Sequence, residues 1–431
     1  MQETVFTWGG PAVKFGAGAV DEIGHDVATL GASRVLVVTD PGVAATGLPR
    51  RVTDQIRAAG LTAGLFAEVH VEPTDRSILA AVDFAKDGGW DGFVAVGGGS
   101  SIDTAKAVNL MTSYPGDLAD YLNPPFGAGR APAGAVKPLV AVPTTAGTGA
   151  ESTAVCVMDL LDLKVKTGIS HPRLRPVLAV VDPAVTLTLP PAVTAATGFD
   201  VLCHAVESFT ARSYDSYEKR RPEQRVAYCG ANPISDIWIR STLPLLARSF
   251  RTSYRRGDDL AARTDMLQAA LFAGLGFGNA GVHLPHACSY PIAGRVGAFR
   301  PDGYPGEPPA VDGHANPPGL VPHGMAVVLT AAAAFRRTYD ASPDRHLEAA
   351  HALDPSTDAV AAERERLPRA VIRLMRDTGL PNGLEAIGYR DTDVGDLVEG
   401  ALQQHRLLTI APIDVDAEVL GGVFGESLRL W

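Results

Sequence analysis

Residues 91–108 read DGFVAVGGGSSIDTAKAV and contain the clearest structural signal in the chain. The apolar run at 91–96 predicts a short buried strand, and three glycines separate it from a helical pattern. Such a turn lets a ligand approach the backbone, and the helix N-terminus offers N–H groups that suit a phosphate. Because Ile102 stands at the third glycine position, the pattern is not the dinucleotide motif G-x-G-x-x-G. A phosphate site and a tight turn without a ligand therefore both remain open.

Further short strands are predicted on both sides of this stretch. Short apolar runs lie at 34–40, 64–69, 139–145 and 177–183. Helical patterns at 49–59 and 77–86 separate the first three strands. Strands and helices that alternate at this spacing predict a parallel sheet with crossover helices, and we expect this α/β organisation over residues 1–190.

The pattern changes after about residue 190. Long segments rich in alanine and leucine, without a strand pattern, lie at 192–211, 234–250 and 258–277. They predict helices, and we expect residues 191–431 to form a second, helical domain. Two irregular segments interrupt it: residues 213–233 are charged and polar, and residues 291–322 are rich in proline and glycine.

The composition excludes several other classes of protein. With 46% apolar and 20% charged residues, the 431-residue chain is typical of a folded globular protein rather than a disordered one. Its formal net charge of −10 argues against a nucleic-acid partner, which a basic surface would attract. We find no apolar run long enough for a membrane span and no signal-peptide pattern. Scattered cysteines without a C-x-x-C pair indicate reduced thiols, so we expect a cytoplasmic enzyme.

A second small-residue turn, PTTAGTGAE at 143–151, follows another predicted strand. Alone it is more typical of an ordinary loop, but two such loops at the ends of parallel strands favour a nucleotide. Asp40 ends the first predicted strand, at 34–40. A carboxylate there can accept ribose hydroxyls and repel a 2′-phosphate, which favours NAD over NADP. It is equally plausible that Asp40 is a simple turn residue. The candidate nucleotide-binding residues are Asp40, Gly97, Gly98, Gly99, Ser100, Asp103, Thr144, Thr145 and Thr148.

A set of histidines and one aspartate in the helical half indicates a metal site. Asp200 and His204, in GFDVLCHAVESF, are four residues apart and project from one face of a predicted helix. The pair alone is better explained as a buried Asp–His hydrogen bond. His283 and His286, in AGVHLPHACSYP, and His323, in LVPHGMAVV, lie in equally apolar surroundings. Three imidazoles and one carboxylate suit Fe(II) or Zn(II), so the full set favours a catalytic metal.

Together these motifs resemble those of the iron-containing, or group III, alcohol dehydrogenases. GGGSSIDTAK resembles their diphosphate loop and PTTAGTGAE their second nucleotide loop, and DVLCHAVES, HACSYP and PHG resemble their metal-ligand segments in the same order. The resemblance covers nearly the whole chain. It implies a dehydroquinate synthase-like fold, with an α/β dinucleotide-binding domain over 1–190, an all-α metal-binding and catalytic domain over 191–431, and the active site between them.

The same resemblance implies the cofactors, Fe(II) with Zn(II) as the alternative, and NAD. The implied metal ligands are Asp200, His204, His286 and His323. Lys166, in KVKTGIS, is implied to contact NAD. The family is commonly dimeric or larger, so we expect a homo-oligomer whose other partners are small-molecule substrates.

Within the family, GFGNAGVHLPHACSYPIAG and ANPISDIW resemble the hydroxyacid–oxoacid transhydrogenase branch. This implies oxidation of 4-hydroxybutyrate to succinate semialdehyde coupled to reduction of 2-oxoglutarate to 2-hydroxyglutarate, without net use of free cofactor. An aldehyde reductase that uses free NADH is the alternative, and a non-catalytic nucleotide or metal sensor is a third. The acidic substrates need a cationic partner. The candidates are Arg212, Arg225, Arg295 and Arg300, although each of them is better explained as a solvated surface charge.

Two features depart from the broader family. Tyr290 stands where many members have an additional histidine, so Tyr290 and His283 are the candidates for proton transfer. For His283, a hydrogen-bonded role behind the ligands is at least as well supported. A long insert rich in proline and glycine separates His286 from His323, and we expect it to form a lid or substrate wall. His314 lies in this insert as a rival ligand that we do not favour.

Overall fold

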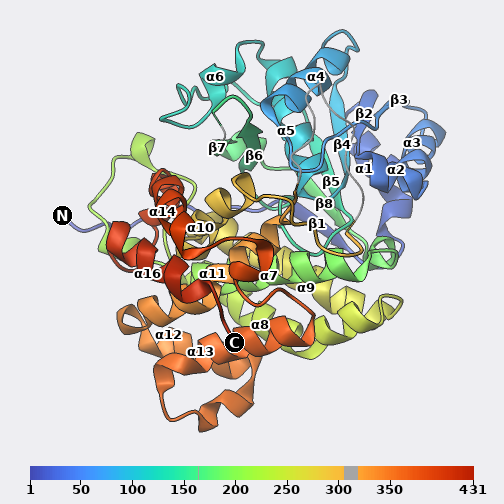
Figure 1. Cartoon of the computed structure of the whole chain (residues 1–431). Helices are drawn as coiled ribbons and strands as arrows, with labels where there is room; N and C mark the ends of the chain where they lie inside the picture. The colour runs from blue at the N-terminus through green and yellow to red at the C-terminus, as the bar shows by residue number, and fades with distance from the viewer. Residues whose placement is uncertain (164, 305–318) are drawn as a thin grey trace. The chain divides into compact units, whose positions relative to one another are not determined.

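A six-stranded parallel sheet lies at the centre of residues Gly10–Thr188, one of two units into which contacts divide the chain in the computed structural model (Figure 1). The structure describes residues 1–163, 165–304 and 319–431. The strand order is β1-β8-β5-β4-β2-β3, and the pairings are parallel, which confirms the predicted parallel sheet. The strands are β1 (Ala12–Phe15), β2 (Arg34–Val38), β3 (Thr62–Phe66), β4 (Gly92–Gly97), β5 (Leu139–Pro143) and β8 (Leu178–Val181).

Both faces of this sheet are buried against helices, which explains why its strands read as continuous apolar runs. Val35 and Val37 of β2 pack with the helices of one face, α1 and α3. Leu36 and Val38 alternate with them and pack with α4 and α5 on the other. The helices of this unit are α1 (Ile23–Thr29), α2 (Pro41–Ala45), α3 (Leu48–Ala58), α4 (Asp75–Lys86), α5 (Gly99–Ser113) and α6 (Leu118–Tyr121).

The order of the strands reverses between β2 and β4. From β2 the chain continues to β3 at the edge of the sheet, whereas from β4 it continues to β5 on the opposite side. In open α/β sheets, ligands bind outside the carboxyl ends of the strands at such a point. The fold therefore brings the end of β2, before Asp40, next to the glycine turn that follows β4.

Two parts of this unit were not predicted from the sequence. The short edge strand β1 has exposed side chains along most of its length, so it lacks an apolar pattern. The antiparallel hairpin of β6 (Val155–Leu160) and β7 (Val165–Ser170) lies outside the main sheet, where it packs against α5.

The second unit is helical and contains Leu189–Tyr304, residues 319–431 and Met1–Gly9. Its central helix α7 is buried almost all round, as is typical of a helix that is apolar on every face. The three helices predicted in this half correspond to α7, α8 and α9. The helices are α7 (Pro191–Thr210), α8 (Pro233–Arg255), α9 (Leu260–Ala280), α10 (Leu284–Gly294), α11 (His323–Thr338), α12 (Pro343–Leu353), α13 (Arg366–Asp377), α14 (Val394–Leu402), α15 (His405–Leu408) and α16 (Ala417–Ser427).

The first nine residues belong to the helical unit, a detail that the sequence did not predict. Nε1 of Trp8 donates to the carbonyl of Leu275 at 3.2 Å. The side chain of Asn279 accepts from the backbone N–H of Gly9 at 3.0 Å and donates to its carbonyl at 3.0 Å. These contacts anchor the N-terminal segment to α9.

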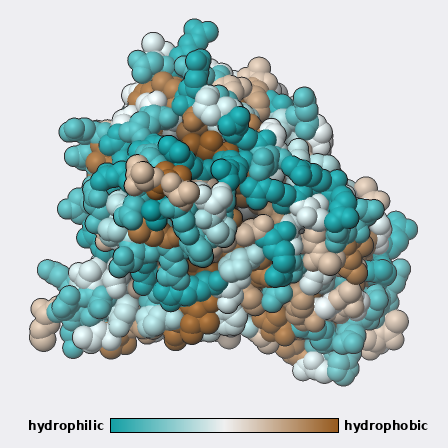
Figure 2. All heavy atoms as spheres, turned by 90° about the horizontal axis from the view of Figure 1, so that it is seen from below, coloured by the Kyte–Doolittle hydropathy of each residue, from teal (hydrophilic) through white to brown (hydrophobic). Residues whose placement is uncertain are grey.

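The predicted lid falls largely on residues 305–318, so its role and the position of His314 lie outside the described residues. Among the residues that the structure describes, no helix has both the length and the hydropathy that crossing a membrane requires. On the face drawn in Figure 2, hydrophilic side chains predominate and apolar ones lie between them in small groups.

Asp182, directly after β8, fastens this strand to the turn that follows β1. Its Oδ2 accepts from the backbone N–H groups of Gly18 and Val20 at 3.0 and 3.2 Å, and its Oδ1 accepts from that of Ala184 at 2.9 Å. The residue is 1% exposed. In Asp182→Asn an NH₂ group replaces one acceptor, so we expect the free energy of unfolding to fall by about 1–3 kcal/mol. Chemical denaturation checks this, and an unchanged midpoint and slope would contradict it.

Candidate metal centre and cofactor-binding loops

Asp200 and His204 lie one turn apart on the buried helix α7. Nε2 of His204 is 3.5 Å from Oδ1 of Asp200, as the spacing of four residues predicts. The His204 ring also stacks on Phe277 of α9, with the ring centroids 3.8 Å apart and the planes nearly parallel. Packing between two helices therefore fixes the imidazole without any hydrogen bond to its Nδ1.

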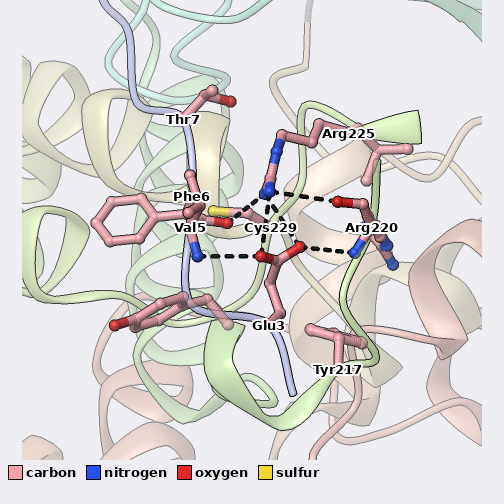
Figure 3. A pocket seen from close by; sticks show the side chains of 10 residues that line it. Glu3, Val5, Phe6, Thr7, Tyr217, Arg220, Arg225 and Cys229 are labelled. Carbon is pink, nitrogen blue, oxygen red and sulfur yellow. Dashed lines mark hydrogen bonds and ion pairs between the residues drawn. The ribbon is translucent and has the colours of Figure 1, made fainter. Parts of the chain in front are cut away.

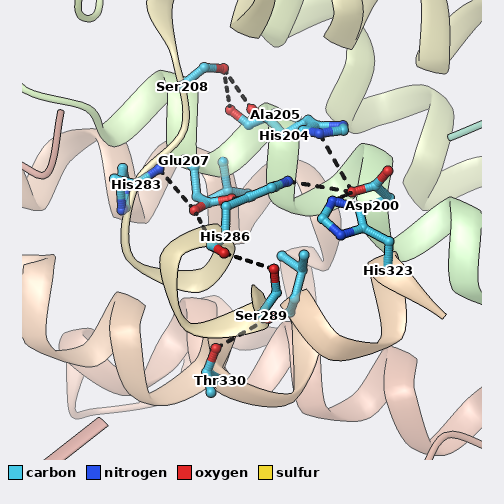
Figure 4. A network of polar contacts seen from close by, with 12 residues as sticks. Asp200, His204, Ala205, Glu207, Ser208, His283, His286, Ser289, His323 and Thr330 are labelled. Carbon is cyan, nitrogen blue, oxygen red and sulfur yellow. Dashed lines mark hydrogen bonds and ion pairs between the residues drawn. The ribbon is translucent and has the colours of Figure 1, made fainter. Parts of the chain in front are cut away.

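Two more helices bring their first residues to the same point (Figure 4). Nε2 of His286, in the first turn of α10, is 3.5 Å from Oδ1 of Asp200. Nε2 of His323, the first residue of α11, is 3.7 Å from the same oxygen. One ligand atom each from Asp200, His286 and His323 lies within 4.8 Å of the others. These three residues belong to the set that the resemblance implied as ligands; the fourth, His204, lies beside Asp200 but outside the group whose ligand atoms are all within 4.8 Å of one another.

The spacing of these atoms suits a metal better than hydrogen bonds. Distances of 3.5–3.7 Å are too long for hydrogen bonds, and within the described ranges Oδ1 of Asp200 and Nε2 of His286 are buried without a hydrogen-bond partner. Leaving such atoms unsatisfied is costly. Nitrogen and oxygen atoms about 2.1 Å from a tetrahedral metal are about 3.4 Å apart, and the three separations measured from Oδ1 of Asp200 are close to this value.

The charges of the site are also those of a metal centre. Burial would raise the pKa of Asp200, but the imidazoles of His204 and His323 hold it well below its usual range. Burial lowers the pKa of His204 to about 3, so this ring is neutral and has a lone pair to offer. For His286, burial is outweighed by the carboxylates of Glu207 and Asp200, which raise its pKa to about 9. A metal that binds here would therefore compete with the proton on His286.

Glu207 is a member of this group that the sequence analysis missed. It lies on α7 seven residues after Asp200, on the same face, and is completely buried. Its Oε1 accepts from the backbone N–H groups of His283 and His286 at 3.0 and 3.1 Å, and its Oε2 contacts Nδ1 of His286. A second carboxylate at this spacing in an apolar helix was the signal in the sequence.

The two candidates for proton transfer lie in different places. Nε2 of His283 is 3.1 Å from the hydroxyl of Thr210, and Figure 4 shows its ring on the side of Glu207 away from Asp200. Burial lowers the pKa of His283 to about 4, so it stays neutral. The ring of Tyr290 lies 6.4 Å from that of His323, beside the metal group. Tyr290 is thus the better placed of the two for a role in proton transfer.

Most of the candidate nucleotide residues gather at the carboxyl ends of β2, β4 and β5. A Cβ atom on Gly98 would lie 3.3 Å from Oγ1 of Thr145, and one on Gly99 would lie 2.7 Å from Thr148. The glycine turn and the threonine loop therefore pack against each other. Gly98 is the N-cap residue before α5 and provides no side-chain cap, which leaves the first N–H groups of the helix to other acceptors.

Asp40 and Thr144 lie at the same edge of the sheet. Asp40 accepts from the backbone N–H of Val43 at 2.9 Å and from the hydroxyl of Ser101 at 3.1 Å, so it is fixed beside the start of α5. The backbone N–H of Thr144 donates to the carbonyl of Gly97 at 3.0 Å, and its buried hydroxyl has no partner among the residues that the structure describes. Both side chains are held where a nucleotide at this edge would meet them.

Asp103 is engaged within the protein. Its Oδ1 lies 3.1 Å from Nζ of Lys106, and its Oδ2 accepts from the backbone N–H of Val157 in β6 at 2.9 Å. These contacts attach the β6–β7 hairpin to α5, which gives Asp103 a structural role. The proposal that Asp103 contacts the cofactor gains no support from its position.

Lys166 lies between two carboxylates. Its Nζ is 2.8 Å from Oε2 of Glu72 and 2.9 Å from Oδ2 of Asp159. Burial would lower the pKa of Lys166, but these carboxylates raise it well above its usual value, so the residue stays charged. The backbone N–H of Glu72 donates to the hydroxyl of Ser100 at 3.1 Å. Glu72 thereby connects Lys166 to the glycine turn.

Arg225, a candidate for binding a substrate carboxylate, is instead paired inside the protein (Figure 3). Its guanidinium contacts both carboxylate oxygens of Glu3, at 3.1 and 3.0 Å. The backbone N–H of Arg220, together with Arg225, lowers the pKa of Glu3 to about 2 against the effect of burial. Arg225 therefore anchors the N-terminal segment. Arg212 and Arg295 form more exposed pairs, with Asp414 and Asp396 respectively.

Gly324, which follows His323, gives a first test of the metal centre. A Cβ atom there would lie 2.0 Å from the carbonyl oxygen of Ala196 and 2.8 Å from Cβ of Asp200. Gly324→Ala should therefore push α11 away from α7, lower the free energy of unfolding by about 1–3 kcal/mol and weaken Zn²⁺ binding. Gly421→Ala in α16, where a Cβ meets nothing within 4 Å, is the matched control and should bind Zn²⁺ normally. Wild-type affinity in Gly324→Ala, measured by chelator competition, would contradict the packing argument.

The proton on His286 gives a second test. Because its pKa is raised to about 9, this proton competes with a metal at neutral pH. The apparent Zn²⁺ affinity should rise about tenfold for each pH unit between about pH 7 and about pH 9, and then level off. Competition titrations over this range, corrected for the chelator, measure the slope. An affinity that stays constant across the range would show that no proton leaves His286 on binding.

Two family models match the chain. The model for iron-containing alcohol dehydrogenase matches residues 11–183, and that for the C-terminal part of the Fe-containing alcohol dehydrogenase family matches residues 222–298. Among curated relatives, the mitochondrial hydroxyacid-oxoacid transhydrogenase of Xenopus tropicalis is 42% identical over 424 residues, 97% of this chain and 89% of that protein. The protein of the same name from Bos taurus is 42% identical over 426 residues, with the same coverage.

Solved structures agree with these matches. 1,3-Propanediol oxidoreductase has a TM-score of 0.84 and 27% identity, with 98% of this chain and 100% of that chain covered. Sulfoacetaldehyde reductase from Bifidobacterium kashiwanohense, solved in complex with NAD⁺, has a TM-score of 0.76 and 25% identity, with 98% of each chain covered. By its identity to relatives over nearly its whole length, this chain belongs to the iron-containing alcohol dehydrogenase family, and it is an oxidoreductase that acts on CH–OH groups.

Proposed function

We propose that this chain is a hydroxyacid–oxoacid transhydrogenase. It oxidises 4-hydroxybutyrate to succinate semialdehyde and reduces 2-oxoglutarate to 2-hydroxyglutarate. The observation that carries this proposal is the 42% identity, over 97% of the chain, to proteins of that name. The hydride and the proton that leave the hydroxyacid are those that the oxoacid gains, so the reaction balances with NAD unchanged overall.

The metal site of the proposal consists of Asp200, His204, His286 and His323, which would hold Fe(II) or Zn(II). When bound, the metal supplies a Lewis acid that lowers the pKa of a hydroxyl group placed beside it. The chain provides the anionic oxygen of Asp200, neutral His204 and buried walls that exclude water. Tyr290, next to the His323 ring, is the proposed residue for handling the hydroxyl proton, with His283 the less well placed alternative.

The nucleotide site of the proposal lies at the carboxyl ends of β2, β4 and β5. The uncapped start of α5 would bind the diphosphate, and the threonine loop and Asp40 would bind the riboses. A carboxylate at Asp40 favours NAD over NADP. The fold shared with a reductase solved in complex with NAD⁺ supports this assignment. Lys166 would contact the same cofactor from its position near Ser100.

The second candidate function is an aldehyde reductase that uses free NADH. Its support is the similarity to 1,3-propanediol oxidoreductase and to sulfoacetaldehyde reductase over 98% of the chain. Both candidates use the same metal and nucleotide residues, so they differ in substrate and in whether NAD stays bound. We also propose a homo-oligomer and a cytoplasmic location, although the named relatives are mitochondrial.

The deciding experiment omits free nucleotide. Purified protein reconstituted with Fe(II) is mixed with 4-hydroxybutyrate and 2-oxoglutarate, and 2-hydroxyglutarate is followed by mass spectrometry. We expect product in excess of enzyme, with ping-pong kinetics, because a retained cofactor serves both half-reactions. His323→Ala should lose both the metal and the activity. If product forms only when NADH is supplied, and an aldehyde is then reduced, the chain is the plain reductase.

A further inference from the structure

We infer that Glu207 is a positioning residue, which selects the proton position and ring orientation of His286 and thereby turns Nε2 of His286 toward Asp200. The inference rests on the proposed metal site and deepens it. It does not depend on which substrate the enzyme uses. Among the described residues, the hydrogen bonds of Glu207 run to His283 and His286, and it meets His286 at Nδ1, the nitrogen opposite the one that faces Asp200.

The two oxygens of Glu207 have different partners. Oε1 accepts from the backbone N–H groups of His283 and His286 at 3.0 and 3.1 Å. These donors lie at the start of α10, where a helix leaves its first N–H groups unsatisfied. One side chain of α7 thus docks the N-terminus of α10. Its other oxygen, Oε2, is then left facing Nδ1 of His286.

A carboxylate accepts hydrogen bonds and cannot donate them when it is ionised. Oε1 of Glu207 already accepts from two backbone N–H groups, which is the arrangement of a carboxylate that acts as an acceptor. Nδ1 of His286 must therefore be the nitrogen that carries hydrogen. A neutral imidazole has one N–H and one lone pair, so the lone pair falls on Nε2. That atom is the one 3.5 Å from Asp200 and without a hydrogen-bond partner (Figure 4).

The ring of His204 is held in a different way from that of His286. Its Nδ1 is buried and has no hydrogen-bond partner. Stacking fixes its ring instead, between Phe277 at 3.8 Å and His286 at 4.7 Å. His286 has a carboxylate for the same purpose, and hydrogen-bonded partners of this kind typically change metal affinity by about 10–100-fold.

Glu207→Gln is the variant that tests the inference. The amide oxygen can still accept the two backbone N–H groups, and this orientation turns the NH₂ group toward Nδ1 of His286. Nδ1 must then accept, which moves hydrogen to Nε2 and blocks the ligand atom. We expect the affinity for Co²⁺ or Zn²⁺ to fall by about 10–100-fold and the visible spectrum of the Co²⁺ protein to change.

A second variant, Glu207→Asp, separates positioning from packing. Gln keeps the volume of Glu, whereas Asp keeps the acceptor-only carboxylate and leaves a small cavity. If Glu207 has a purely structural role, the Glu207→Gln protein should bind Co²⁺ more tightly than the Glu207→Asp protein. If Glu207 positions His286, the Glu207→Asp protein should bind Co²⁺ more tightly. The matched control is Asp182→Asn, since Asp182 also accepts from backbone N–H groups, is 1% exposed and has no imidazole partner among its hydrogen bonds. It should bind Co²⁺ with wild-type affinity.

The outcomes distinguish the failure of this inference from failure of the proposed site. Wild-type Co²⁺ affinity and spectrum in Glu207→Gln would overturn the role of Glu207, and so would a weaker affinity in Glu207→Asp than in Glu207→Gln. If Glu207→Gln does not fold, Glu207→Asp provides the test alone. A Co²⁺ affinity of Glu207→Asp more than about 100-fold below that of wild type would then overturn the role of Glu207, because this loss exceeds the usual effect of a hydrogen-bonded partner of a metal ligand. A wild-type protein that binds no Co²⁺ would instead contradict the metal site itself.

Discussion

Oδ1 of Asp200 lies 3.5–3.7 Å from the Nε2 atoms of three histidines, which come from α7, α10 and α11. Of these atoms, Oδ1 of Asp200 and Nε2 of His286 are buried and have no hydrogen-bond partner among the residues that the structure describes. The arrangement constrains all three helices. Gly324 lets α11 approach the backbone of α7, and Glu207 binds the first N–H groups of α10. The packing of the helical unit is therefore organised around polar atoms that a cation would satisfy.

The candidate cofactor site of the α/β unit is built from other kinds of groups than the metal site. Its candidate cofactor site uses backbone N–H groups, hydroxyls and the absence of side chains at Gly98 and Gly99, rather than convergent charges. Charged residues near this edge mostly bind one another. Asp103 attaches a hairpin to α5, and Lys166 is held by Glu72 and Asp159. A charged residue within a motif can thus stabilise the loop that forms the ligand site rather than contact the ligand itself.

The structure was easiest to predict from the sequence where a local pattern of residues determines an element. Buried strands that end in glycine or threonine turns, and helices without polar faces, were recognisable from composition and period. The Asp200 and His204 pair followed from a spacing of four residues. Contacts between distant segments could not be predicted: Glu3 and Arg225 are 222 residues apart. The spacing of seven residues from Asp200 was a signal for Glu207, but it does not reveal the partners of Glu207, which are N–H groups at the start of α10. The hairpin β6–β7 was missed because it packs on a helix instead of joining the sheet.

The membership of Met1–Gly9 in the helical unit has a consequence for synthesis. Glu3 pairs with Arg225, and Gly9 pairs with Asn279, which lies 270 residues later. The ribosome makes the chain from its N-terminus, and domains generally begin to fold in that order. The whole of Gly10–Thr188 is therefore translated before the partners of the first nine residues exist. The earliest residues of the chain are thus among the last to reach their final contacts.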